Sequence, residues 1–367
     1  MTIKIREISN NNDLFDLKAT WEHLLSQSEH TVFSTWEWQT TWWKHFGKNK
    51  KPLVLLAQED GETIGIAPFT YSILNVFGFH TRKISFIGAP NADYNDFILA
   101  RNPAECIRKF LDYIYQSFGE EWDSIDLDDI SDASTITEIL GIDGNLKTVS
   151  SRVLHKCLYM KLPDNYDQLY NRLHPKLRQN LRRNMKNLTN DHSVEIEDYS
   201  NVDKVNQGMQ ILFDLHQRRW ESEGERGAFA EPEIRDFNLD LAQNLIPKKW
   251  LSLMSMNVDG VPAACSYGFR YNKKFYYYLH GVNPDFNRYS VGNLMMASVI
   301  KKSIADQLSE VDLLRGDEPF KYRWSDSVRN NYNFVITKNR SSSKMRSWFL
   351  RKYAYYAKRL ATGLRID

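Results

Sequence analysis

The sequence predicts a mixed α/β fold that is built twice along the chain. Segments with strand and helix patterns follow one another in the order β–α–α–β–β–β–α–β in each half. Short turns join the three central strands of each half, which suits antiparallel neighbours and argues against parallel β–α–β repeats. The 367 residues also exceed the roughly 100–200 residues of one typical domain. We therefore expect two mixed sheets, each with helices on both faces.

The first half begins with an alternating strand and a helical region that two asparagines precede. A helix rich in tryptophan comes next, and the turn signal Asp60-Gly61 then joins two strands. The predicted elements are strands at 3–8, 53–58, 63–71, 83–87 and 124–127, and helices at 11–25, 33–46 and 104–118.

The second half repeats this order. A helix at 166–188 is expected to break at Pro175, because proline removes a backbone donor and clashes with the preceding turn. The other predicted elements are strands at 153–161, 194–199, 251–257, 262–271, 274–279, 311–314 and 332–338, and helices at 202–221, 233–245 and 291–308.

Three matched segments indicate an internal duplication. The run LVLLAQEDGETIGIAPFTY corresponds to LSLMSMNVDGVPAACSYGF, so that Asp60-Gly61 faces Asp259-Gly260. Downstream, RKISFIG ending at Gly88 corresponds to KFYYYLHG ending at Gly281, and EWDSIDL corresponds to EVDLLRG. Three matches in the same order favour duplication over coincidence.

Residues 341–367 form a basic segment beyond the second half, with a predicted amphipathic helix at 341–363. Its apolar side chains at helical spacing are Met345, Phe349, Tyr353, Tyr356 and Leu360. We favour a helix that docks this stripe on the body of the protein, and peripheral contact with a membrane surface is the alternative.

Composition and missing motifs narrow the function. The 48 basic and 46 acidic residues leave a net charge of +2, so no global field gathers DNA or anionic membrane. The charged N-terminal residues, the lack of an 18-residue apolar run and three scattered cysteines predict a cytoplasmic protein. The His-Glu-x-x-His, Gly-x-Ser-x-Gly and P-loop patterns do not occur, and no metal site is predicted.

The junction before the helix at 291–308 predicts an anion site. Ser290 can cap this helix, and Gly292 allows close approach to backbone amides at its N-terminus. The junction resembles the loop with which GNAT acyltransferases bind the pyrophosphate of coenzyme A, Gln/Arg-x-x-Gly-x-Gly/Ala. Gly292 conforms to that pattern, whereas Asn287 and Ser290 depart from it. The resemblance implies a donor site formed by Asn287, Arg288, Tyr289, Ser290, Val291, Gly292 and Asn293.

Over residues 20–340 the chain resembles the Fem-like acyltransferases, especially the BioF2-like and cellulose-biosynthesis acetyltransferase-like branch. The motifs that carry the resemblance are FSTWEW at 33–38, the hairpin at 60–68, LHPKLRQNLRRNMKNL, the loop 290–292 and DLLRGDEPFKYRWSD. The resemblance implies two GNAT-like domains. Residues 1–150 would form a degenerate domain that shapes the acceptor cleft, and residues 151–340 would bind the donor.

The resemblance also implies a reaction. Acetyl-CoA or another acyl-CoA would act as co-substrate without a permanently bound cofactor, and the acceptor would be an amine or hydroxyl of a sugar or cell-envelope precursor. The same fold with aminoacyl-tRNA as donor, or a non-catalytic scaffold, are the alternatives.

Several residues are candidates for catalysis and substrate binding. Arg178 and Arg182 lie on a basic helical stripe that suits an anionic ligand, although such a face can simply be solvated. His280 is a candidate base near neutral pH, Lys321 can stabilise negative charge, and Asp317 can take the proton of an amine. Further candidates are Tyr267 as the acid for the leaving group, and Asp93, Tyr94 and Trp324 for the acceptor.

Overall fold

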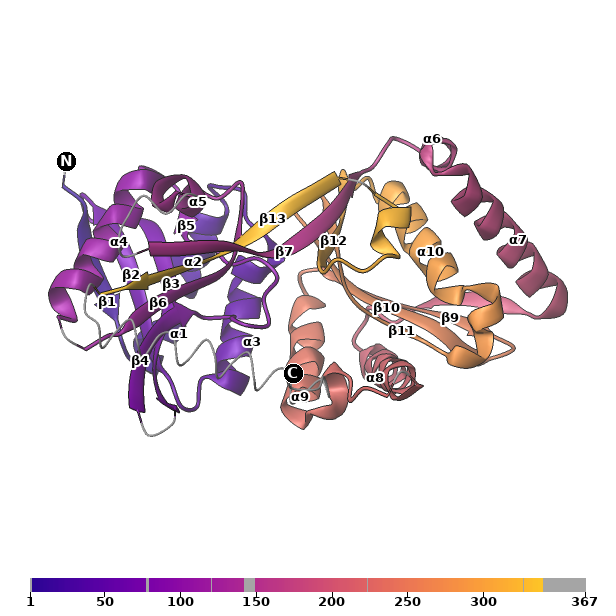
Figure 1. The fold of residues 1–367 in the computed structure, drawn as a ribbon, viewed down its shortest axis with the longest axis horizontal. Coiled ribbons are helices and arrows are strands. Elements are labelled where there is room, and N and C mark those ends of the chain that lie inside the picture. Colours follow the sequence, from indigo (N-terminus) through magenta and orange to yellow (C-terminus); the bar gives the residue numbers. More distant parts are fainter. Residues whose placement is uncertain are drawn as a thin grey trace, which may run out of the picture. The chain divides into compact units, whose positions relative to one another are not determined.

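The computed structural model describes residues 2–76, 79–119, 121–141, 149–222, 224–325 and 327–338. The helix expected at 341–363 lies outside these residues. The chain divides into two compact units (Figure 1). Unit 1 comprises Met1–Lys156 and the chain from Arg329 onward, and unit 2 comprises Cys157–Val328.

Unit 1 contains the strand order β1-β2-β3-β4-β6-β13, part of a 13-stranded sheet, and β5 pairs with β3. The strands are β1 (Lys4–Ile8), β2 (Lys51–Glu59), β3 (Glu62–Val76), β4 (Phe79–Phe86), β5 (Ile98–Leu99), β6 (Ser124–Ser131) and β13 (Ser327–Thr337). The helices are α1 (Asn11–Phe15), α2 (Lys18–Leu25), the 3₁₀ turn η1 (Val32–Ser34), α3 (Trp36–Phe46), α4 (Pro103–Ser117) and α5 (Thr135–Leu140).

Unit 2 contains the strand order β7-β12-β11-β10-β9-β8. The strands are β7 (Val149–Lys161), β8 (Val194–Asp198), β9 (Leu251–Val258), β10 (Val261–Tyr271), β11 (Lys274–Val282) and β12 (Glu310–Arg315). The α-helices are α6 (Tyr166–Arg172), α7 (Pro175–Asp191), α8 (Val205–Ser222), α9 (Pro232–Leu245) and α10 (Val291–Ala305). Three 3₁₀ turns join them, η2 (Ala228–Ala230), η3 (Pro284–Tyr289) and η4 (Lys321–Arg323). The predicted break at Pro175 is confirmed, since α7 begins there.

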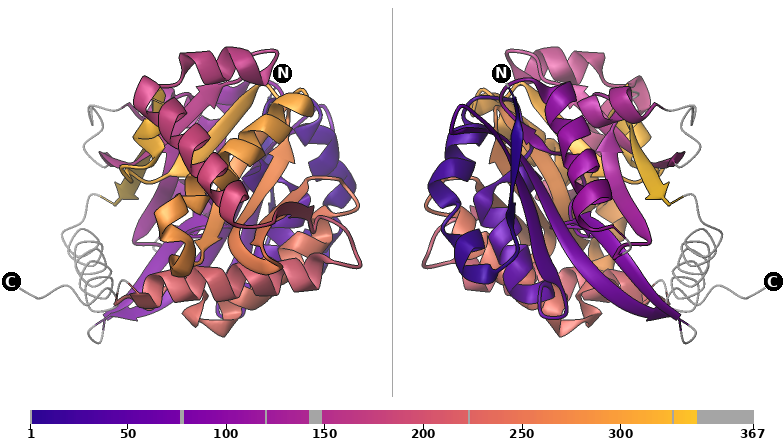
Figure 2. Two further views of the ribbon diagram at one scale, coloured as in Figure 1. Left: turned by 90° about the vertical axis from the view of Figure 1, so that its right-hand side faces the viewer. Right: turned by 90° about the vertical axis from the view of Figure 1, so that its left-hand side faces the viewer.

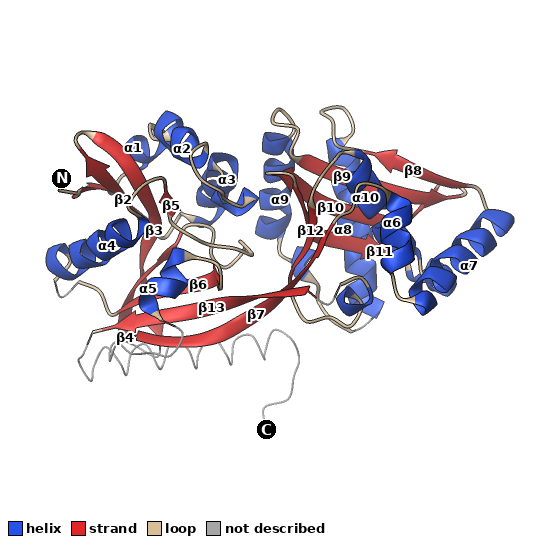
Figure 3. Cartoon of the chain, turned by 90° about the horizontal axis from the view of Figure 1, so that it is seen from above, coloured by secondary structure: helices blue, strands red, loops and turns tan. Residues whose placement is uncertain are grey.

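Helices cover both faces of the sheet in unit 2. Helices α7 and α10 lie on one face, whereas α8 and α9 lie on the other (Figures 1 and 2), and Figure 3 shows the strands of each unit between helices. Leu177, Leu181 and Leu188 of α7 pack with Leu294 and Val299 of α10 in the apolar core of the first face. Burial of these side chains holds α7 against α10, which positions the site described below.

The duplicated hairpins are confirmed in three dimensions. Asp60 and Asp259 both have φ 51°, and Gly61 and Gly260 follow with φ 84° and 77°. Positive φ at two successive residues is the geometry of a type I′ turn, which explains the Asp-Gly pair in both hairpins. Each unit contains parallel and antiparallel strand pairs, as the sequence predicts, but the strands of both units belong to a single 13-stranded sheet, whereas the sequence suggested two sheets.

The boundary between the units differs from the predicted one. Residues 331–337 of β13 pair with β6 in unit 1, although the sequence placed this strand in the second half. Strand β7 crosses the boundary, and its residues from Cys157 pair with β12 in unit 2. Propensity predicts such strands but not their partners, because β-pairing depends on tertiary context.

A search of the helices among the described residues finds none that is long and apolar enough to cross a membrane.

Candidate functional site

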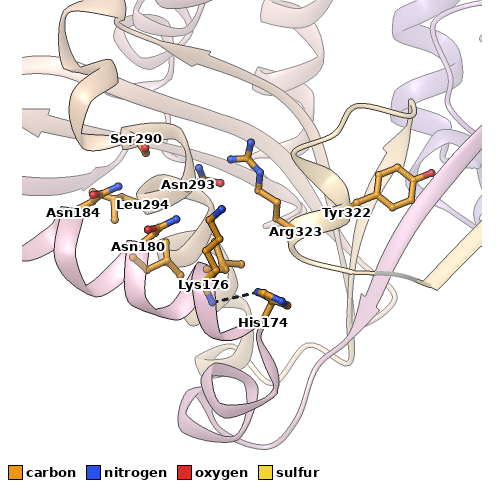
Figure 4. Close-up of a pocket in the computed structure, with 11 residues that line it drawn as sticks. His174, Lys176, Asn180, Asn184, Ser290, Asn293, Leu294, Tyr322 and Arg323 are labelled. Carbon is orange, nitrogen blue, oxygen red and sulfur yellow. Dashed lines mark hydrogen bonds between the residues drawn. The ribbon is translucent and has the colours of Figure 1, made fainter.

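A polar pocket of about 460 Å³ lies in unit 2 between α7, the N-terminus of α10 and η4 (Figure 4). Its polar lining residues are His174, Lys176, Asn180, Asn184, Ser290, Asn293, Tyr322 and Arg323. Leu177, Leu181 and Leu294 complete its wall. We call this cavity the polar pocket.

The start of α10 gives the pocket an affinity for anions. Ser290 has φ 50° and makes no side-chain capping bond, and the N–H groups of Asn293 and Leu294 donate to Ser290 O at 2.9 and 3.3 Å. The helix dipole adds a partial positive charge at this end. Figure 4 shows Lys176 and Arg323 extending toward Asn293 from two different elements. Two cations and a helix N-terminus together suit a phosphate or diphosphate group.

Only part of the predicted donor loop lines this pocket. Ser290 and Asn293 do, whereas Val291 is fully buried in the core. Asn287 is exposed, and Tyr289 donates its hydroxyl to Asp191 Oδ2 at 2.8 Å. Arg288 is turned away from the pocket, donating to Tyr289 Oη at 2.6 Å.

A side chain at Gly292 would meet no steric obstacle within the protein. A Cβ at this position would lie 3.6 Å from Val282 Cγ1, which is ordinary van der Waals contact. Gly292 is also absent from the residues that line the polar pocket.

Strands β11 and β12 separate beside the pocket. They pair in parallel only at Lys274–Glu310, Phe275–Val311 and Tyr276–Asp312, and then diverge. The carbonyl groups of β12 beyond this point need another donor, because buried backbone groups are almost always paired.

Lys321 supplies that donor. Its ammonium donates to Leu314 O at 3.2 Å and to Arg315 O at 2.7 Å, and it lies 2.9 Å from Glu318 Oε2. The side chain is 6% exposed, whereas that of Glu318 is 51% exposed. Lys321 is therefore a buried cation between the separated strands rather than a solvated surface charge.

His280 lies in the same region with its ring against Phe320, at a centroid distance of 5.5 Å. Arg219 Nη1 lies 2.8 Å from His280 Nε2, and since arginine can only donate, this nitrogen accepts. Burial, together with the charges of Arg219 and Lys321, lowers the pKa of His280 to about 3. The titration near neutral pH that the sequence suggested is therefore wrong for His280, which is a neutral acceptor in this arrangement.

The other catalytic candidates lie in contrasting surroundings. Asp317 is exposed and accepts a hydrogen bond from the hydroxyl of Tyr322, which lines the polar pocket. Tyr267 is fully buried and contacts Asn238 O of α9 at 3.4 Å, on the side of the sheet away from α10. Burial raises the pKa of Tyr267 well above its usual value, so this hydroxyl is poorly placed to donate a proton to a leaving group.

The predicted acceptor-binding residues are divided between the two units. Asp93 and Tyr94 are buried in unit 1, where the Tyr94 ring lies 6.1 Å from that of Phe33. Trp324 is 5% exposed and packs in the core of unit 2. Neither Arg178 nor Arg182 lines the polar pocket, although Arg182 lines a neighbouring cavity.

Sequence reasoning missed several pocket residues. Lys176, Asn180 and Asn184 stand four residues apart on α7, which places them along one helical face. This spacing was visible in the sequence, but the regular series of arginines and lysines beside it carried the stronger charge signal. Arg323 offered no signal beyond its place in the motif GDEPFKYRW.

Comparisons with known proteins find a family match within unit 2. Residues 175–322 match the family described as Acetyltransferase (GNAT) domain. The match runs from the first residue of α7 into η4, so it includes both sides of the polar pocket. A search of curated proteins finds no match to the sequence.

Three solved structures are similar to nearly the whole chain. FemX has a TM-score of 0.65 at 12% identity, covering 93% of this chain and 99% of its own. L-PGS from Bacillus licheniformis has a TM-score of 0.53 at 11% identity, covering 88% and 92%. A tandem GNAT protein from the clavulanic acid biosynthesis pathway has a TM-score of 0.52 at 8% identity, covering 93% and 100%.

Unit 2 therefore carries a GNAT-type acetyltransferase domain, and the chain is an acyl-transferring enzyme with a fold similar to that of FemX and of a tandem GNAT protein.

Proposed function

We propose that the chain transfers an acyl group, in the simplest case acetyl, from coenzyme A to an amine or hydroxyl of a sugar or other cell-envelope or polysaccharide precursor. The observation that carries the donor assignment is the polar pocket at the N-terminus of α10 inside the GNAT domain. Lys176 and Arg323, together with the positive end of the α10 helix dipole, are expected to hold its diphosphate. The acceptor class rests on the Fem-like resemblance of the sequence.

Acyl transfer would proceed by attack of the acceptor nitrogen or oxygen on the thioester carbonyl carbon. A tetrahedral oxyanion forms, and its collapse breaks the carbon–sulfur bond and releases the coenzyme A thiolate. We assign the stabilisation of the oxyanion to Lys321. Its three N–H donors already have acceptors, and the exposed Glu318 is the partner that the oxyanion can replace with least disturbance.

The acceptor must also lose a proton. His280 is excluded from this task by its low pKa and by the bond from Arg219. We assign the task to Asp317, because its carboxylate is exposed on the same short loop as Lys321. The proton passes from the attacking nitrogen or oxygen to this carboxylate, and then to the departing thiolate or to water.

An aminoacyl-tRNA donor is the alternative within the same fold. Its terminal phosphates could use the same cations, so the pocket alone does not distinguish the donors. The polar pocket is nevertheless small, and no long helical arm occurs among the described residues of the second unit, in which α8 and α9 have 18 and 14 residues.

Titration calorimetry with acetyl-CoA tests the donor. We expect micromolar binding that Arg323→Gln and Lys176→Gln each weaken by about tenfold, since each removes a charge-assisted contact to phosphate. Lys186→Gln is the matched control, because this lysine is exposed on α7 but does not line the pocket. Absence of acetyl-CoA binding, together with binding of aminoacyl-tRNA, would replace the first donor by the second.

A further inference from the structure

A second cavity of unit 2, of about 650 Å³, lies along α7 and α10 beside the polar pocket, and it shares Leu181 and Leu294 with that pocket. We call it the apolar groove. Its remaining lining residues are Tyr166, Tyr170, Arg182, Met185, Ile196, Met254, Ala297, Ser298, Lys301, Lys302 and Ala305. The volume is within the range of about 300–1,000 Å³ that small-molecule sites occupy.

Two hydroxyl groups of the apolar groove already have hydrogen-bond partners within the protein. The hydroxyl of Ser298 donates to Leu294 O at 3.0 Å, and that of Tyr170 donates to Arg178 O at 3.0 Å. Both groups are therefore satisfied within the protein. Ile196 of the edge strand β8 is 43% exposed and adds an aliphatic side chain to this lining. A hydrocarbon chain fits such a lining, whereas a sugar or nucleotide base would find no free partner among these two hydroxyls.

Positive charge lies around the apolar groove. Lys302 is paired with Asp306 at 3.5 Å, but neither Arg182 nor Lys301 makes an ion pair within the described part of the chain. No aspartate or glutamate lines the groove. An anionic group attached to the hydrocarbon chain would therefore meet two available cations and no carboxylate.

We propose that the apolar groove binds a single-chain anionic lipid, with its alkyl chain along Met185, Met254 and Ala297 and its charged head at Arg182 and Lys301. A single chain is expected because one groove of this volume runs between the two helices. The inference does not depend on coenzyme A as donor, since the groove and the polar pocket are separate cavities.

The direct test is calorimetry of the full chain with monomeric lysophosphatidylglycerol, kept below its micelle concentration. We expect saturable binding, weaker binding of the zwitterionic lysophosphatidylcholine, and none of glycerol 3-phosphate, which lacks the chain. Ala297→Phe fills the groove and should weaken the binding of lysophosphatidylglycerol by about tenfold or more. The pair Arg182→Gln and Lys301→Gln should weaken it roughly 3–10-fold and leave lysophosphatidylcholine unchanged, because exposed ion pairs each contribute little.

Controls separate this proposal from its competitors. Lys186→Gln, on α7 but outside the groove, should bind the lipid as the natural chain does. If Ala297→Phe does not fold, the charge variants still decide the question. Three outcomes would each overturn the proposal. The affinities could be equal in all variants, or the chain could bind phosphatidylglycerol vesicles but not the lipid monomer. The third is a dimer of the natural chain that Ala297→Phe loses in sedimentation. Loss of acetyl-CoA binding in the natural chain would instead count against the donor assignment alone.

Discussion

In each unit two parallel strands pair at only three positions, and different side chains donate to the carbonyl groups that follow. In unit 1, β4 and β6 pair in parallel only at Lys83–Ser124, Ile84–Ile125 and Ser85–Asp126, as β11 and β12 do at three positions in unit 2. The two carbonyls that follow in unit 1, of Asp128 and Asp129, accept from the side chain and the backbone of Asn95, each at 3.0 Å. Their counterparts in unit 2, of Leu314 and Arg315, accept from Lys321.

The equivalent carbonyl groups of the two units therefore have donors of different chemistry. In unit 1 the loop after β4 returns to the sheet, and its neutral Asn95 is 4% exposed. Trp42 of α3 also holds this loop, by donating to Asn91 Oδ1 at 2.9 Å. In unit 2 the loop after β11 continues into η3 and α10, and a charged side chain from a later loop takes the carbonyls. The comparison favours unit 2 as the catalytic unit, because there an ammonium group donates to the carbonyls that a neutral amide serves in unit 1.

The largest expected effect comes from removing that ammonium group. Lys321→Gln keeps an amide donor for the carbonyls, as Asn95 provides in unit 1, but it removes the positive charge. We expect turnover to fall by about 10–1000-fold with little change in donor affinity. Steady-state kinetics with acetyl-CoA and a confirmed acceptor measure both quantities.

Lys321→Met separates the two roles of this lysine. Methionine leaves both carbonyls without the side-chain donor, so stability should fall as well as turnover. If Lys321→Gln retains full turnover while Lys321→Met unfolds at a lower temperature, Lys321 has only the structural role that Asn95 has in unit 1.

The fold was largely predictable from the sequence. The duplicated hairpins were visible because type I′ turns require residues that tolerate positive φ, and Asp60-Gly61 and Asp259-Gly260 meet that requirement. The break at Pro175 followed from proline chemistry. The position of β13 was missed, because its alternating pattern is equally compatible with the edge of either sheet.

The site was less predictable. Lys321 was singled out, but its burial and its carbonyl partners depend on the divergence of β11 and β12, which no local pattern encodes. His280 was taken for a titrating base because histidine usually changes charge near neutral pH. Its low pKa comes from burial and from Arg219, which is 61 residues away in the chain.

The second-largest effect is expected at Asn95, whose neutral amide is the counterpart of Lys321 in unit 1. Asn95→Ala removes the amide that donates to Asp128 O and leaves this carbonyl short of a partner. We expect a loss of about 1–3 kcal/mol of unfolding free energy in urea titrations, without a change in acetyl-CoA affinity. A variant with unchanged stability but impaired donor binding would reverse the roles that the comparison gives to the two units.

The third effect is a dependence of stability on pH that arises from Asp96 in unit 1. Burial raises the pKa of Asp96 in unit 1 to about 7, although Ser134 and the Phe97 amide donate to its carboxylate. The folded state therefore holds a proton that the unfolded chain releases near pH 4, so this contribution to stability is full at low pH and is lost as pH rises toward 7. We expect the unfolding free energy to fall by about 2–3 kcal/mol between pH 5 and pH 8, at about 1.4 kcal/mol for each pH unit below 7. Asp96→Asn should flatten that slope in urea titrations, and an equally steep slope in the variant would show that another group is responsible.

The smallest effect is expected at Gly292, where the sequence and the structure disagree. The sequence suggested that glycine is needed for close approach of the donor to the backbone, which predicts weaker binding for any larger residue. In the structure a Cβ at this position would point toward Val282 rather than into the polar pocket, with 3.6 Å to the nearest atom. Gly292→Ala should therefore change acetyl-CoA affinity by less than about threefold, and alanine should add up to about 1 kcal/mol of stability through its higher helix propensity.

Gly208→Ala on α8 is a useful contrast, because its Cβ would lie 2.5 Å from Tyr199 Cβ and must displace that side chain. Tenfold weaker donor binding in Gly292→Ala, with normal thermal stability, would show that the donor lies against the backbone of Gly292 and that the sequence pattern located the diphosphate more accurately than the shape of the pocket does.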